Sequence, residues 1–216
     1  MFSCNDSGEQ SIPVSKEAKK HSNAKVENMI SSFKEAIPLD SGTTVLYPLT
    51  FNNFQDANES RGYSSSSDIG PYWNIAFYNT KDGISKLLTS GAPVRITTFQ
   101  KVNNFMVYAV TSLDYNGDGQ LNQHDPTYLF TSDLNGNQFK QITPDSMHVS
   151  SFDSINKSNI LLIQVQVDTN KDKKFDSSDQ FVPMIFDTTK GEKAKNTFSN
   201  TFTKNVNAVF NKTYKK

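Results

Sequence analysis

The strongest constraint on this chain is a pattern of apolar segments and turns that occurs three times. Glycines in three matching turns, Gly83, Gly136 and Gly191, lie 53 and 55 residues apart. Two apolar segments precede each glycine and two shorter ones follow it, and they are rich in the branched and aromatic residues that favour strands. The sequence therefore predicts a mainly β fold built from about three repeated four-stranded antiparallel units.

A period of this length with four strands per unit is typical of propeller-type blades. Three units are fewer than the roughly four to eight blades of a closed propeller. Three arrangements stay open: a propeller-like arc of stacked sheets, blades that complete one another in an oligomer, or another repeated β arrangement. The expected strands lie at 43–51, 72–78, 84–89 and 94–99, at 104–113, 127–132, 138–143 and 149–152, and at 159–167, 181–186, 193–198 and 202–210.

The acidic residues support a fold with many turns. Sixteen of the 22 acids are Asp, and no Glu occurs between Glu59 and Glu192. Asp competes with the helical backbone and prefers turns and caps, so the middle of the chain is not expected to be helical. The 22 basic residues balance the acids, which excludes a strongly basic nucleic-acid binder.

The first 38 residues are expected to lie outside the β units. Ser3 and Cys4 match the end of a bacterial lipoprotein signal, in which a small residue precedes the cysteine that is lipidated. Residues 1–15 then form the lipoprotein start and a polar tether, and residues 16–38 form one amphipathic helix that Pro38 ends. The β-repeat domain spans 39–216. A single Cys excludes an internal disulfide framework.

Twelve residues of the second unit match the calcium loop of EF-hand proteins. The loop starts at Asp114, and its Asp, Asn and Gly residues stand at the spacing at which side chains of a tight coil point inward. Gly119 allows the sharp turn that a hard cation with six to eight oxygen ligands requires. The expected ligands are Asp114, Asn116, Asp118, the Gln120 carbonyl, Asn122 and Asp125.

A second copy of this loop starts 54 residues later, at Asp168. Lys173 replaces the glycine, which costs roughly 1–2 kcal/mol in the left-handed region, and four carboxylates against three could offset that cost. We expect two bound Ca²⁺ ions. The expected ligands of the second loop are Asp168, Asn170, Asp172, the Lys174 carbonyl, Asp176 and Asp179.

Strands rather than helices are expected on both sides of each loop. Pro126 follows the last ligand, and Tyr128 and Phe130 then alternate with polar neighbours. Such loops have no helix pair to swing open, so a sensor mechanism is not expected. Asp in place of the longer Glu at the twelfth position predicts weak binding, on the order of 10⁻⁴ to 10⁻³ M, as in extracellular modules.

Several segments resemble the blades of the Tol-system periplasmic propeller, which are WD40-like. The turn Asp133-Leu134-Asn135-Gly136 is followed by a strand at 139–143 that ends in Thr, then by 149–153, then by the apolar strand 160–164. Residues 154–156 depart from the family pattern, which has Pro-Asp-Gly there. The resemblance covers about residues 43–200 and implies a bacterial envelope protein with propeller-type blades.

Together these features favour a calcium-binding, non-enzymatic bacterial envelope lipoprotein. Its β repeats would bind a protein or glycan or act as a scaffold, at the periplasm or cell surface, anchored to a membrane through lipid on Cys4. One alternative is a glycan-acting hydrolase, which would need carboxylates outside the loops, such as Asp56, Asp68 or Asp153. A second alternative is a structural module that completes a propeller within an oligomer or larger assembly.

Overall fold

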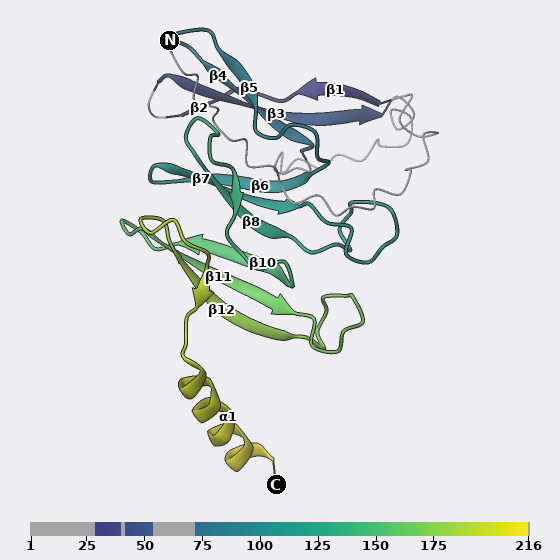
Figure 1. Cartoon of the computed structure of the whole chain (residues 1–216), viewed down its shortest axis with the longest axis vertical. Coiled ribbons are helices and arrows are strands. Elements are labelled where there is room, and N and C mark those ends of the chain that lie inside the picture. The colour runs from purple at the N-terminus through teal and green to yellow at the C-terminus, as the bar shows by residue number, and fades with distance from the viewer. Residues whose placement is uncertain (1–28, 40–41, 54–71, 216) are drawn as a thin grey trace, which may run out of the picture.

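Three antiparallel β-sheets stack on one another along the molecule, and a helix follows the last sheet (Figure 1). The fold was obtained as a computed structural model, and it describes residues 29–39, 42–53 and 72–215. The chain passes through the sheets in order. The expected strands at 94–99 and 149–152 form, but their place in the predicted units is wrong, because each pairs with the segment that follows it and is therefore the first strand of the next sheet. Among the described residues the sheets form no closed barrel or propeller, so the mainly β repeat is confirmed as an open stack.

The first sheet has five strands and the other two have four each. The first sheet contains β1 (Met29–Phe33), β2 (Ile37–Pro38), β3 (Thr44–Asn53), β4 (Asn74–Asn79) and β5 (Ser85–Leu87). The second contains β6 (Arg95–Val102), β7 (Phe105–Thr111), β8 (Tyr128–Asp133) and β9 (Lys140–Gln141). The third contains β10 (Met147–Ser154), β11 (Ile160–Val167), β12 (Gln180–Asp187) and β13 (Lys195–Asn196), and α1 (Asn200–Tyr214) follows.

Two hydrophobic cores hold the stack together, one at each junction between sheets. Side chains alternate between the two faces of a strand, so the middle sheet supplies one set of residues to each core. Tyr108 and Val110 of β7 face the first sheet, whereas Val107 and Ala109 of the same strand face the third. This explains why β7 is apolar throughout rather than alternating with polar residues.

The turn between the third and fourth strands of a sheet packs on the sheet before it. Gly136 has a positive φ of 73°, and a Cβ placed there would lie 2.6 Å from the Phe77 ring of the first sheet. Glycine is therefore required both for the turn and for the close approach. The Thr44 hydroxyl donates to Asn135 Oδ1 of the same turn at 2.6 Å, which fixes the two sheets in register.

The N-terminal helix expected over 16–38 is wrong for its described part. Residues 29–33 form β1, which pairs with β3 so that Phe33 lies opposite Leu49. Pro38 pairs in β2 at the side of β3, an edge position where its missing N–H is tolerated. Pairing with a long neighbouring strand outweighs the helical spacing of the apolar residues there. Residues 16–28 lie outside the described residues, as do the tether and Cys4.

The strand expected at 202–210 is also wrong, because this segment lies in α1. Ser199 caps the helix, and its hydroxyl accepts the Phe202 backbone N–H at 3.2 Å. The capping bond satisfies an N–H that the first helical turn leaves without a partner. The helix has no buried residue and extends away from the third sheet (Figure 1). Among the described helices, none has the length and apolar character needed to cross a membrane.

Candidate functional site

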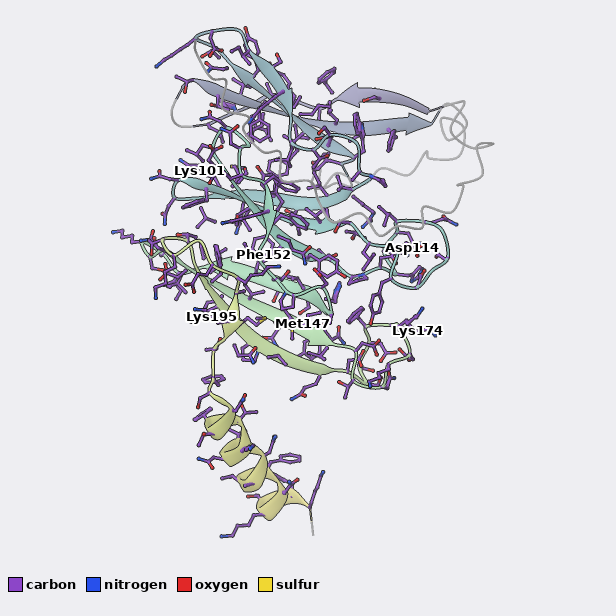
Figure 2. The ribbon with its side chains drawn as sticks, in the orientation of Figure 1. Lys101, Asp114, Met147, Phe152, Lys174 and Lys195 are labelled. Atoms are coloured by element: carbon purple, nitrogen blue, oxygen red, sulfur yellow. The ribbon has the colours of Figure 1, made fainter. Side chains whose placement is uncertain are left out.

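The two loops with calcium-type spacing lie at the same edge of the stack. The first joins β7 to β8 and the second joins β11 to β12, so both connect the second and third strands of their sheets. Figure 2 labels Asp114 at the start of the first loop and Lys174 within the second, on one side of the molecule. Strands flank both loops, as the alternation after Pro126 indicated.

The first loop is organised around the carboxylate of Asp114. Its Oδ1 accepts the backbone N–H of Gly117 at 2.8 Å and of Asp118 at 3.1 Å, and its Oδ2 accepts that of Gly119 at 2.8 Å. Asp118 Oδ1 in turn accepts the Gln120 N–H at 2.8 Å. These bonds coil the backbone around the acidic side chains, so the first, fifth and seventh positions of the motif come together.

The second loop repeats these contacts with different residues. Asp168 accepts the backbone N–H of Asp172 at 3.2 Å and of Lys173 at 3.1 Å, and Asp172 accepts that of Lys174 at 2.9 Å. The Asn at the third position also does the same in each loop. Asn116 Oδ1 accepts the Asp118 N–H at 2.8 Å, and Asn170 Oδ1 accepts the Asp172 N–H at 3.0 Å.

Both loops enter the left-handed region at the same two positions. Gly117 and Gly119 have φ values of 78° and 84°, and Lys171 and Lys173 have values of 61° and 64°. Such a conformation costs a non-glycine residue roughly 1–2 kcal/mol. The second loop therefore follows the path of the first although its own residues disfavour it, and the hydrogen bonds to Asp168 and Asp172 offset that cost.

The last acidic residue of each loop closes the coil from inside the protein. Asp125 and Asp179 are only 3% and 7% exposed. Asp125 accepts the N–H of Tyr115 at 2.9 Å and of Asn122 at 3.0 Å. Asp179 accepts the equivalent N–H groups of Thr169 at 2.8 Å and Asp176 at 3.2 Å. A buried carboxylate needs such donors, and here they tie the start of each loop to its end.

The structure also joins the two loops to each other, which the sequence did not reveal. The Tyr115 hydroxyl of the first loop donates to Asp168 Oδ2 of the second at 3.1 Å, and its ring lies 5.5 Å from that of Phe175. His148 also packs on Phe175, and the centroids of the two rings are 5.4 Å apart. The only sequence signal was an aromatic residue at the second position of the first loop.

The local hydrogen bonds also set the protonation of the loops. The Gln120 N–H and then the Asn122 amide lower the pKa of Asp118, and the backbone N–H and hydroxyl of Ser178 lower the pKa of Asp176. Burial and then the bond to Asp168 raise the pKa of Tyr115. At neutral pH Asp118 and Asp176 are therefore ionised, and Tyr115 keeps the proton that it donates.

The donor set of the loops is chemically suited to a hard cation. Each loop offers Asp and Asn oxygens and no nitrogen or sulfur donor at the expected ligand positions, which is the preference of Ca²⁺. In the arrangement described, the carboxylates accept backbone N–H groups. Within the described ranges, no group of three or more His, Cys, Asp or Glu side chains is assembled as a metal centre. The loops therefore match calcium loops in the spacing of their residue types and match each other in backbone path, and calcium binding stays a prediction.

The carboxylates required by the hydrolase alternative are not brought together by any described contact. Asp153 is exposed on β10, and Asp56 and Asp68 lie outside the described residues. A hollow of about 350 Å³ beside the first loop is lined by Arg95, His124 and three neighbouring residues of the loop, none of them acidic. This hollow therefore offers no pair of carboxylates for acid–base catalysis.

No protein family matches the chain, and no curated protein matches it.

Proposed function

We propose that this protein is a calcium-binding, non-enzymatic β-repeat protein in which two Ca²⁺ ions stabilise the connections between paired strands. The observation that carries the proposal is the equivalence of the two loops. They share acceptor positions, N–H donors and left-handed residues, and the second loop keeps this path with lysines where the first has glycines. Asn103, Gln138 and Lys157 also have a positive φ outside the loops, so the shared set of acceptors and donors supports the proposal rather than the strain alone.

Bound calcium would act by neutralising the clustered carboxylates of each loop. Seven of the sixteen Asp residues lie in the two loops, and their mutual repulsion opposes folding when no cation is present. A ligand that binds only the folded state adds stability by linkage, about 1.4 kcal/mol per site at tenfold excess over the Kd. Weak sites are sufficient for this task where calcium is permanently abundant, as it is outside the cytoplasm.

Thermal unfolding with calcium and with a chelator tests the proposal. Calcium at millimolar concentration should raise the Tm by several degrees, because about 1 kcal/mol shifts the Tm of a chain of this size by roughly 2–4 °C. Asp114→Asn and Asp168→Asn each keep an acceptor for the loop N–H groups but remove one negative charge, so each should lose about half of the shift.

Asp133→Asn is the matched control for these variants. Asp133 also accepts two backbone N–H groups, from Asn135 and Asn137 at 2.8 Å each, but it ends β8 at the start of the β8–β9 turn. This variant should keep the full calcium-dependent shift. An equal loss in Asp133→Asn and in the two loop variants would overturn the assignment of the loops.

The location that we propose is the bacterial envelope, with lipid attached to Cys4 and a protein or glycan as the ligand of the repeats. It is supported by the Phe2-Ser3-Cys4 sequence and by the abundance of calcium that weak sites require. Mass spectrometry of the Cys4 peptide from a membrane fraction should show acyl chains on the cysteine. An unmodified thiol in that fraction would contradict the anchoring.

A further inference from the structure

The strand register assigns the side chains of each sheet to two faces, one on the side of the preceding sheet and one on the side of the following sheet. We call the face toward the following sheet the trailing face, and the face toward the preceding sheet the leading face. On the trailing face, equivalent pairs across the second and third strands are Leu46–Phe77, Val107–Thr131 and Leu162–Ile185. On the leading face they are Tyr47–Ala76, Tyr108–Phe130 and Ile163–Met184.

The trailing face is buried wherever a sheet follows it. Leu46 of the first sheet and Val107 of the second have no exposed surface, because each packs in the core at the next junction. Leu162, at the same position of the third sheet, is 46% exposed, and Phe181 of the same face is 49% exposed. The third sheet thus presents the apolar surface that its two relatives bury.

The leading face shows the opposite distribution. Tyr108 and Ile163 are 0% and 3% exposed in the second and third sheets. On this face of the first sheet Phe33 and Leu87 are 69% and 46% exposed. With Tyr47 they line a groove of about 490 Å³, which continues around the sheet edge to Phe77 and Lys86. The two ends of the stack therefore expose the two complementary halves of one junction, which the chain itself forms twice (Figure 1).

A lysine at one register position follows the same rule. Lys86 of β5 and Lys140 of β9 stand at equivalent register positions. Each contacts the glycine turn of the following sheet. Lys86 donates to Asn137, and Lys140 donates to the Gly191 carbonyl at 2.8 Å. Lys195 is the third member, and no sheet follows it among the described residues. It pairs with Glu192 of its own sheet instead.

We propose that the trailing face of the third sheet binds the leading face of the first sheet in a second copy of the chain. This contact would have the same form as the junction between the first and second sheets and the junction between the second and third. Lys195 would then meet the turn of Gly83 in the neighbouring copy, which contains the acidic Asp82. Such a contact is head to tail, and two copies that close on each other would contain six sheets, within the range of propellers.

The helix α1 is the competing occupant of the third sheet. Its apolar residues include Val209, which is 66% exposed, and the helix buries none of its side chains. The helix offers neither the glycine turn nor the sheet surface that Lys140 and Val107 meet at the internal junction. A second copy supplies both, so we assign the surface to a copy of the first sheet.

Sedimentation of the full chain across the micromolar range, with calcium present, tests the assignment. The wild-type chain should sediment as a dimer or a larger head-to-tail assembly. Leu162→Arg on the trailing face and Leu87→Glu on the leading face should each lower the mass toward that of one chain. Ile155→Arg is the matched control, because Ile155 is 44% exposed in the β10–β11 turn, and this variant should keep the wild-type mass.

Mixing the two interface variants distinguishes head-to-tail contact from contact between identical faces. A Leu162→Arg chain keeps an intact leading face and a Leu87→Glu chain keeps an intact trailing face, so the mixture should form a heterodimer. Circular dichroism verifies folding, and Phe181→Arg and Phe33→Arg replace any variant that does not fold. A wild-type chain that stays monomeric, an assembly insensitive to either face, or a mixture that forms no heterodimer would each overturn the proposal.

Discussion

At the scale of single residues, the second loop is a case in which side-chain chemistry imposes a backbone path. Lys171 and Lys173 occupy conformations that favour glycine, with φ values of 61° and 64°. This conformation brings the backbone N–H groups of the next residues within hydrogen-bond distance of the Asp168 and Asp172 carboxylates. Asp168 accepts those of Asp172 and Lys173, and Asp172 accepts that of Lys174. The strain therefore stays in the fold because the oxygen-rich positions require it.

Lys173→Gly should stabilise the protein. It removes left-handed strain of roughly 1–2 kcal/mol, and the greater entropy of glycine in the unfolded chain returns part of that gain. We expect a net gain of about 0.5–1 kcal/mol, measured by denaturant unfolding in chelator. Lys174→Gly, at a residue without a positive φ, should destabilise instead. Equal effects at both positions would contradict the account of strain.

Gly136→Ala should destabilise the junction between the first two sheets. A Cβ at Gly136 would lie 2.6 Å from the Phe77 ring, whereas a Cβ at the equivalent Gly83 would meet nothing within 4 Å. Both residues have a positive φ, so the difference between the two alanine variants isolates the clash. We expect Gly136→Ala to cost about 1–3 kcal/mol more than Gly83→Ala in urea unfolding. Equal costs would show that the contact with Phe77 is unimportant.

At the scale of elements, the strands of the three units were predictable and the segments at both ends were not. Turn glycines and alternating apolar residues indicated each paired strand, and these features are local in sequence. The pairing of 29–33 with β3 is a long-range contact that the helical spacing of its apolar residues conceals. In α1, apolar residues such as Phe202, Val206 and Phe210 satisfy both a helical period and an alternating one, so pattern alone could not distinguish them.

The candidate site was predictable in its residues but not in its connections. The spacing of Asp and Asn is the same in the sequence of each loop, so the equivalent positions could be matched directly. The bond from Tyr115 to Asp168 joins residues 53 positions apart and depends on how two sheets stack. Nothing local specifies that contact, and the same holds for the packing of His148 on Phe175.

His148 makes the element that supports the second loop sensitive to acid. Its Nδ1 accepts the Thr127 backbone N–H at 3.0 Å, which requires an unprotonated nitrogen, and burial lowers the pKa of His148. In the unfolded chain the histidine takes up a proton near pH 6.5, above the pKa in the folded state. Stability should therefore be complete above about pH 6.5 and should decrease as the pH falls below that value.

Thermal melts in chelator from about pH 7.5 to 5.5 measure this effect, because that interval spans the ordinary histidine pKa. His148→Asn is the suitable comparison, since its side-chain oxygen can accept the Thr127 N–H without titrating. The wild-type Tm should fall more steeply with acid than that of the variant. Identical profiles for the two proteins would contradict a role for His148.

At the scale of the whole molecule, repetition links the fold, the loops and the exposed ends. The same junction between sheets occurs twice, the same loop occurs twice at one edge, and the two faces of the junction recur uncovered at the ends. The loops proposed to bind calcium and the surfaces proposed for assembly lie on different sides of the repeat. Calcium at the loop edge and a second copy at the stacked ends therefore do not compete for surface.

Isothermal titration calorimetry of the full chain with CaCl₂ tests the central claim most directly. We expect two calcium ions per chain, with dissociation constants on the order of 10⁻⁴ to 10⁻³ M. Asp114→Asn and Asp168→Asn should each leave one ion bound, and Asp133→Asn should leave two. A wild-type chain that takes up no calcium at millimolar concentration, or loop variants that each still bind two ions, would contradict the claim.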